Sequence, residues 1–126
     1  MVDKGEAWAQ IMMGGWYQNG EHGLKQSYVM AAMLFEKAVA QGDPDAMYDL
    51  ALLYRDGTGV VQSFEKTVEL YTMAVEQGDV KAMYNLGCLY REGQGVVQSF
   101  EKSAELYTMA AEQGYVSAMI NLGVLY

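Results

Sequence analysis

The chain has 126 residues, of which 52% are apolar, and a formal net charge of −8. This length fits one domain, and the acidic balance argues against nucleic acid and anionic membrane surfaces, which attract clusters of Lys and Arg. The sequence shows no signal peptide and no run of about 20 apolar residues, so we expect neither export nor a membrane-spanning helix. One cysteine, Cys88, cannot form an internal disulfide and favours a cytoplasmic location.

An internal repeat dominates the sequence. Residues 46–81 and 82–117 are identical at 26 of 36 positions without a gap. A fixed period between about 20 and 50 residues is typical of stacked-repeat proteins. Residues 118–126 restart the unit, and residues 9–45 form a more distant copy with one residue added within Gly20–Gly23. We therefore predict a single domain, 1–126, with repeats at approximately 9–45, 46–81 and 82–117 and a half repeat at 118–126.

The second helix of the first repeat is unusually apolar. Residues 28–35 are eight apolar residues in succession, so this helix is apolar nearly all round. Its outward positions are Val29, Met33, Glu36 and Ala40, where the later repeats carry Glu, Glu, Thr and Glu.

The third repeat shows the two expected helices most clearly. Asp79 is placed to cap a helix at about Val80–Glu92, the glycines in Gly93-Gln94-Gly95 favour a turn, and Ser99 is placed to cap the second helix. The second helix is predicted to expose Glu101, Glu105 and Glu112, and to bury Phe100, Ala104, Tyr107 and Ala111. The predicted fold class is all-α, an α/α superhelical solenoid of about three and a half 36-residue helix-turn-helix repeats.

The final segment, 118–126, has no charged residue, and solenoids normally end in polar capping elements. Two explanations stay open: the natural chain continues beyond this sequence, or the apolar ends associate. Association predicts a homo-oligomer, most simply a twofold dimer. The residues predicted for that contact are Val29, Met33, Met119, Leu122 and Tyr126.

The small and aromatic residues of the repeat resemble the Sel-one-like repeat, a relative of the tetratricopeptide repeat. The matching residues of the third repeat are Ala82, Leu86, Gly87, Tyr90, Gly93, Gly95, Val96, Ser99, Lys102, Leu106, Tyr107, Ala110, Ala111 and Gly114. The family usually has an acidic residue where Ser27, Ser63 and Ser99 stand, and often Trp where Leu70 and Leu106 stand. Serine still caps a helix and leucine still fills a core.

The resemblance implies a non-catalytic scaffold or adaptor that binds other proteins on the concave surface lined by the first helix of each repeat. Some secreted bacterial members of the family brace every hairpin with a cysteine pair. Cys88 alone departs from that pattern.

The candidate partner-binding residues are the positions of the first helices that the core does not use. Apolar and aromatic side chains edged by amides and arginine suit a protein or peptide partner. Alternatively, the tyrosines among them pack on neighbouring helices as ordinary repeat residues. The set is Trp8, Ile11, Tyr48, Asp49, Leu52, Arg55, Tyr84, Asn85, Cys88, Arg91, Ile120, Asn121 and Val124.

Charged residues give two weaker candidates. Arg55 and Arg91, the only arginines, could hold a carboxylate or phosphate, but ion pairs with the adjoining Asp56 and Glu92 are the favoured interpretation. The glutamates of the second helices form an acidic ridge that either steers a basic partner or is a solvated face, which we favour. These glutamates are Glu65, Glu69, Glu76, Glu101, Glu105 and Glu112.

Catalytic and metal-binding patterns are missing. His22 is the sole histidine, and no zinc-type spacing of Cys and His occurs. We therefore expect no enzyme, no metal and no cofactor. Besides the adaptor, two functions stay open: a self-assembling structural protein and an oligomer that binds a small molecule.

Overall fold

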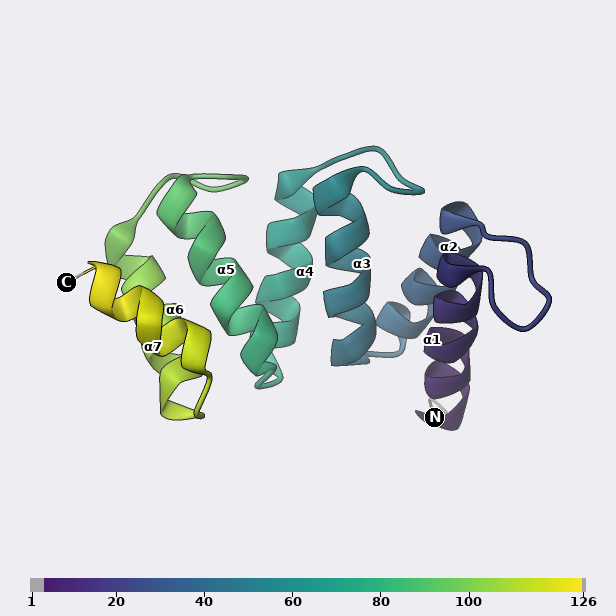
Figure 1. The fold of residues 1–126 in the computed structure, drawn as a ribbon, viewed down its shortest axis with the longest axis horizontal. Helices are drawn as coiled ribbons and strands as arrows, with labels where there is room; N and C mark the ends of the chain where they lie inside the picture. The colour runs from purple at the N-terminus through teal and green to yellow at the C-terminus, as the bar shows by residue number, and fades with distance from the viewer. Residues whose placement is uncertain (1–3, 126) are drawn as a thin grey trace. The chain divides into compact units, whose positions relative to one another are not determined.

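The computed structural model describes residues 4–125, and all regular structure within that range is helical. Figure 1 shows the helices α1 (Lys4–Asn19), α2 (Tyr28–Ala40), α3 (Pro44–Asp56), α4 (Phe64–Glu76), α5 (Val80–Glu92), α6 (Phe100–Glu112) and α7 (Val116–Leu125). Their alternation as first and second helices of successive repeats confirms the predicted all-α repeat fold. No helix in the described range is both long and apolar enough to cross a bilayer.

Side-chain caps stand at the starts of α2, α3, α5 and α6. Asp79 Oδ1 accepts a hydrogen bond from Ala82 N at 2.9 Å, and α5 has the predicted bounds. Ser99 Oγ accepts from Lys102 N at 3.1 Å at the start of α6, also as predicted. These bonds satisfy N–H groups that have no partner within the first turn of a helix.

The two-glycine turns after α3 and α5 seat each repeat on the one before it. The second glycine has a positive φ, 76° for Gly59 and 75° for Gly95. A Cβ on Gly95 would lie 2.5 Å from the carbonyl oxygen of Phe64, the first residue of α4, and a Cβ on Gly59 would clash with the carbonyl of Tyr28 in α2. Only glycine meets both demands, because other residues rarely adopt this φ and their Cβ has no room.

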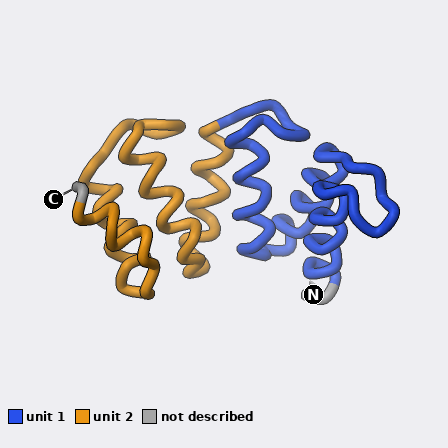
Figure 2. Tube along the Cα trace, viewed as in Figure 1, with its two compact units in different colours: residues 1–63 blue, residues 64–126 orange. Residues whose placement is uncertain are grey.

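The chain divides into two compact units, residues 1–63 and 64–126 (Figure 2). In the first unit, α2 packs against both α1 and α3. Phe35 of α2 is buried against Gly14 of α1. A Cβ on Gly14 would lie 2.5 Å from the Phe35 ring, so the close contact requires glycine. A cluster of small side chains, Ala7, Ala38 and Ala46, joins the three helices of this unit.

In the second unit, α5 packs against α4 and α6, and α6 packs against α7. Its core joins Met83, Tyr107, Ala110 and Ala118, with partly buried residues such as Tyr84 packed around them. Tyr107 fills the space beside Gly87, where a Cβ would lie 2.8 Å from its ring. Close approach of two helices depends on such small residues at the contact.

The prediction that α6 buries its first residue, Phe100, is wrong. Phe100 is 57% exposed, whereas the equivalent Phe64 of α4 is half-buried and lies under the turn around Gly95. No turn among residues 4–125 covers Phe100 in that way. Tyr107 is buried as predicted, and the other buried side chains of α6 are the small Ser103 and Ala110, while Ala104 and Ala111 are half-buried.

Candidate partner-binding surface

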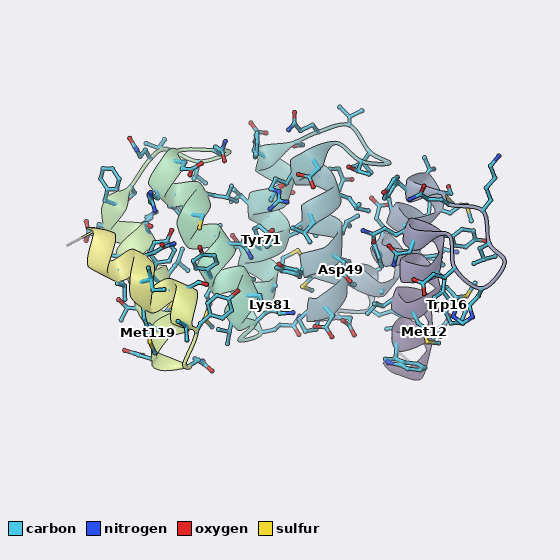
Figure 3. All side chains as sticks on the ribbon, viewed as in Figure 1. Met12, Trp16, Asp49, Tyr71, Lys81 and Met119 are labelled. Atoms are coloured by element: carbon cyan, nitrogen blue, oxygen red, sulfur yellow. The ribbon has the colours of Figure 1, made fainter. Side chains whose placement is uncertain are left out.

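The predicted partner-binding residues lie on the first helices of the repeats, and each unit holds its own group. In the first unit they belong to α1 and α3, and in the second to α5 and α7. Figure 3 shows the side chains along these helices, with Asp49 labelled on α3.

In the second unit, Tyr84 stands at the centre of an aromatic cluster. Its ring centroid lies 5.5 Å from that of Tyr107 and 5.2 Å from that of Tyr115. The Asn121 amide on α7 donates a hydrogen bond to Tyr84 Oη at 2.9 Å. These contacts tie α5 to α6 and α7, so Tyr84 is partly engaged within the unit, as the alternative interpretation of this residue expects.

Next to this cluster, the Tyr107 hydroxyl donates to Cys88 Sγ at 3.1 Å. Burial, together with the neighbouring Cys88, raises the pKa of Tyr107 to about 12, although Ser103 and Arg91 lower it in part. Burial and the same thiol also raise the pKa of Tyr84, and the amide of Asn121 opposes that rise. Both hydroxyls are therefore protonated at neutral pH and serve as hydrogen-bonding groups rather than as acids.

The accessible part of this face differs from residue to residue. Ile120 is 63% exposed, and Asn85, Cys88 and Arg91 are half-buried. The Asn85 amide donates to the carbonyl of Lys81 at 2.8 Å within α5. The side chain of Val124 lies outside the described part of the structure.

In the first unit, Trp8 on α1 is 64% exposed. Ile11 packs against the alanine cluster at the contact of α1, α2 and α3. The predicted residues on α3, which are Tyr48, Asp49, Leu52 and Arg55, are all half-buried. Trp8 is thus the most accessible member of this group.

The expected ion pair of the first arginine is confirmed. Arg55 Nε lies 3.0 Å from Asp56 Oδ1, and the two side chains are 42% and 54% exposed. A pair this exposed contributes at most about 1 kcal/mol to stability. The pair partly neutralises the guanidinium, which weakens the alternative that Arg55 holds an anionic ligand.

The residues predicted for self-association are mostly accessible. Val29 and Met33 on α2 are 57% and 49% exposed, and Met119 on α7 is 48% exposed. Leu122 instead packs against the core of the second unit. Tyr126 lies outside the described residues.

The aromatic cluster contains one residue that the sequence analysis missed. Tyr115 stands where Asp43 and Asp79 cap the first helices of the second and third repeats. This break in the repeat was the available signal, because a tyrosine cannot replace the carboxylate as a cap. In the structure its ring covers one side of Tyr84.

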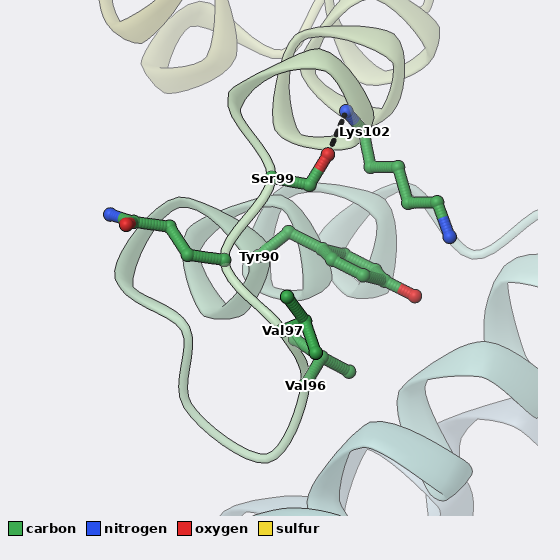
Figure 4. Close-up of a pocket in the computed structure, with 6 residues that line it drawn as sticks. Tyr90, Val96, Val97, Ser99 and Lys102 are labelled. Atoms are coloured by element: carbon green, nitrogen blue, oxygen red, sulfur yellow. Dashed lines mark hydrogen bonds between the residues drawn. The ribbon is translucent and has the colours of Figure 1, made fainter.

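A shallow pocket of about 430 Å³ lies beside the turn between α5 and α6 (Figure 4). The Lys102 ammonium lies 5.3 Å from the centre of the Tyr90 ring, and the exposed Val97 is at the pocket edge. The turn is held by Gln98, whose amide donates to the carbonyl of Arg91 at 2.7 Å. The pocket is apolar with one cation, and it was not predicted, because its valines were treated only as part of a turn.

These surfaces offer groups that suit contact with another chain. Exposed apolar side chains, aromatic rings, amides and one thiol are present, which suits recognition of another chain. Among residues 4–125, no three His, Cys, Asp or Glu side chains are grouped to hold a metal ion.

Comparison of the sequence with protein-family models finds one family along most of the chain. The family model of the Sel1 repeat matches residues 9–43, 44–79 and 80–115. No curated protein sequence matches the chain significantly.

Solved structures with the same fold include two of related sequence. The protective antigen c5321 of uropathogenic Escherichia coli strains, which displays an SLR fold, is 35% identical with a TM-score of 0.93. A Sel1 repeat protein from Oxalobacter formigenes is 32% identical with a TM-score of 0.89. The alignments cover 98% and 95% of this chain but only 26% and 49% of those proteins.

A third structure shows likeness of fold alone. Cysteine rich protein B of Helicobacter pylori is 18% identical, with a TM-score of 0.72, over 94% of this chain and 96% of its own.

Proposed function

The chain belongs to the Sel1 repeat family, and from that premise we propose that it is an interaction module that binds a protein or peptide through the first helices of its repeats. Proteins of this family are generally non-catalytic scaffolds that mediate protein–protein interactions. For this chain, we propose the same role, without catalysis and without a cofactor.

The observation that carries the proposal is the exposure of large apolar side chains on these helices. Trp8 on α1 and Ile120 on α7 are 64% and 63% exposed. Apolar and aromatic residues in such positions typically supply the largest part of the binding energy at an interface. Half-buried Tyr48, Asn85 and Arg91 add hydrogen-bonding groups on the neighbouring helices of their units.

Affinity capture from a lysate of the source cell tests this proposal. The test variant carries Trp8→Asp and Ile120→Asp, one change in each unit. The control variant carries Val61→Asp and Val97→Asp, which alter side chains that are 88% and 89% exposed on the turns. The control is expected to recover the same partner as the wild type, while the test variant recovers at least about tenfold less, since a buried charge at an interface costs more than about 1.4 kcal/mol.

Equal recovery by both variants would place the partner on another surface. Circular dichroism of both variants serves as the folding control, because all four substituted side chains are exposed and their loss should leave helicity unchanged.

The exposed apolar residues of α2 and α7 favour a second candidate, self-assembly into a homo-oligomer. Val29 and Met33, one helical turn apart on α2, are 57% and 49% exposed, and Met119 on α7 is 48% exposed. Apolar side chains exposed side by side commonly mark a contact. Sedimentation of the purified chain at rising concentration is expected to show an increase in mass. A mass that stays at that of the monomer would exclude this candidate.

A further inference from the structure

Helix α2 carries an outward face unlike those of the other second helices. Val29, Met30 and Met33 on this face are 57%, 37% and 49% exposed. In α4 and α6 the same three positions are occupied by Glu, Lys and Glu, all exposed. The fold therefore does not require apolar side chains here, because two repeats of the same chain form the same helix with charged residues at these places.

Two lysines flank this apolar face. Lys37 follows Met33 by one helical turn, and Lys25 lies three residues before the helix. Both side chains are exposed, and neither ammonium has an ion pair among the described residues. The one acid on the face, Glu36, accepts a hydrogen bond from the Tyr54 hydroxyl at 3.1 Å. We define Val29, Met30 and Met33 with Lys25 and Lys37 as the α2 face.

The outer face of α6 has the opposite arrangement. Glu101, Glu105 and Glu112 are exposed, and Met109, which is 40% exposed, lies between the last two of them. Lys102 is also exposed, and its ammonium lies 5.3 Å from the centre of the Tyr90 ring on α5. At the position of Met109 the α2 helix has Lys37. The carboxylates of Glu101 and Glu112 are eleven residues apart, which is about 16 Å along a helix, and the two lysines of the α2 face are twelve residues apart.

We propose that the α2 face of one copy of this protein binds the outer face of α6 of a second copy. Antiparallel docking brings Lys37 to Glu101 and Glu105 and brings Lys25 to Glu112, while Met33 and Val29 meet Met109. The match is one of charge and of apolar surface, with cations around an apolar centre on one side and carboxylates around a methionine on the other. This contact rests on the self-association proposed above and names the surfaces that make it.

Helix α6 is the favoured acidic helix because its first residue, next to Glu101, exposes an aromatic side chain more fully than the first residue of α4 does. Phe100 at its first residue is 57% exposed, whereas the equivalent Phe64 is half-buried. Because the two surfaces of the contact differ, each copy presents one donor face and one acceptor face. Made once per pair of copies, this contact produces rings or open chains, and made twice about a twofold axis it produces a dimer.

Charge reversal tests the contact in sedimentation velocity experiments from about 10 µM to about 1 mM protein. The wild type is expected to associate, and less so as salt rises from about 0.05 to about 0.5 M, because salt screens the flanking ion pairs. One variant carries Lys25→Glu and Lys37→Glu, and the other carries Glu105→Lys and Glu112→Lys. Each variant alone should be monomeric, and their equimolar mixture should associate, because each variant presents faces that complement those of the other.

Two further variants control for folding and for position. Val29→Glu with Met33→Glu gives α2 the residues that α4 and α6 already have, so the variant should fold normally and associate at least about tenfold more weakly. Glu69→Lys with Glu76→Lys makes in α4 the substitutions that the acidic-face variant makes in α6, and it should associate like the wild type.

Several results would overturn the proposal, and they separate its two levels. A wild type that stays monomeric at about 1 mM removes both self-association and this contact. A wild type that associates together with the Val29→Glu, Met33→Glu variant leaves self-association standing but removes the α2 face. A mixture of charge-reversed variants that stays monomeric, or a loss of association in the α4 variant instead of the α6 variant, removes the pairing of α2 with α6.

Discussion

Tyr107 is fully buried, yet its hydroxyl reaches the half-buried thiol of Cys88 on α5. The equivalent residue of the first repeat is Phe35, which is also buried and also lies against a glycine of the preceding helix. The ring at this position fills the space between the two helices of a repeat. The hydroxyl is an addition of the later repeats, and it connects the core of the second unit to the surface of α5.

The pKa of Tyr107 makes stability depend on pH in the alkaline range. Its pKa is about 12 in the folded chain, against an ordinary value of 10. Between these values the unfolded chain has lost the proton and the folded chain has kept it, so the free energy of unfolding falls as pH rises, by at most about 3 kcal/mol. Below pH 10 this contribution is constant. Urea unfolding from pH 9 to 12 should therefore show a decline that is shallower in Tyr107→Phe, and parallel declines would contradict the assignment.

The glycine beside this ring is a second residue whose replacement can be predicted. Ala at position 87 would place a Cβ 2.8 Å from the buried Tyr107 ring, whereas Ala at position 123 on α7 would meet nothing within 4 Å. Gly87→Ala should lower the free energy of unfolding by about 1–3 kcal/mol through overpacking. Gly123→Ala should raise it by up to about 1 kcal/mol through helix propensity. Chemical denaturation measures both, and a stabilised Gly87→Ala would show that α5 and α6 can move apart without cost.

At the scale of elements, the turn between the two helices of a repeat has two tasks. It reverses the chain, and its second glycine rests on the first residue of the preceding second helix. The helix ends at Gly114 and Gly78 also need a positive φ, but a Cβ there would meet no neighbour within 4 Å. Gly95 and Gly114 therefore both need a positive φ, but only at Gly95 would a Cβ also clash with a neighbouring backbone.

This difference leads to a matched prediction. Gly114→Ala should cost about 1 kcal/mol, the price of a left-handed conformation for a residue with a Cβ. Gly95→Ala should cost about 2–4 kcal/mol, because the Cβ also lies 2.5 Å from the carbonyl of Phe64. Thermal melting of the two variants compares these costs, and equal losses would show that the turn can lift off α4 freely.

The elements were predictable to the extent that their signals are local. Asp79 and Ser99 mark helix starts because a cap acts within three residues, and the bounds of α5 follow from such signals. The burial of Phe100 was not predictable from its own helix. Its exposure is decided by whether the turn of another repeat covers it, which is a contact between segments about 30 residues apart in the equivalent pair Phe64 and Gly95.

At the scale of the whole molecule, the net charge of −8 conceals an uneven distribution. The outer faces of α4 and α6 carry three glutamates each, while the α2 face carries two lysines around apolar residues. A chain with both surfaces can bind copies of itself despite its overall repulsion, because opposite local charges act within about 8 Å in physiological salt. This is why the proposed contact is expected to weaken with salt.

The candidate partner-binding surface was predicted only in outline. The repeat period identified the right helices, but it did not distinguish Tyr84, which is engaged by Tyr107, Tyr115 and Asn121, from Ile120, which is exposed. Periodicity reports the direction of a side chain, whereas its accessibility depends on what stands at the facing position. Whether the exposed members bind a partner stays a prediction.

The contact between the two-glycine turn and the preceding helix has a consequence for how the number of repeats can evolve. The turn meets the backbone carbonyl of Tyr28 in one repeat and of Phe64 in the next, and a carbonyl is present whichever side chain stands there. Duplication or loss of a gene segment encoding 36 residues therefore leaves this contact intact, because the turn needs no matching side chain on the helix that it rests on. The near-identity of residues 46–81 and 82–117 is what such a duplication would leave.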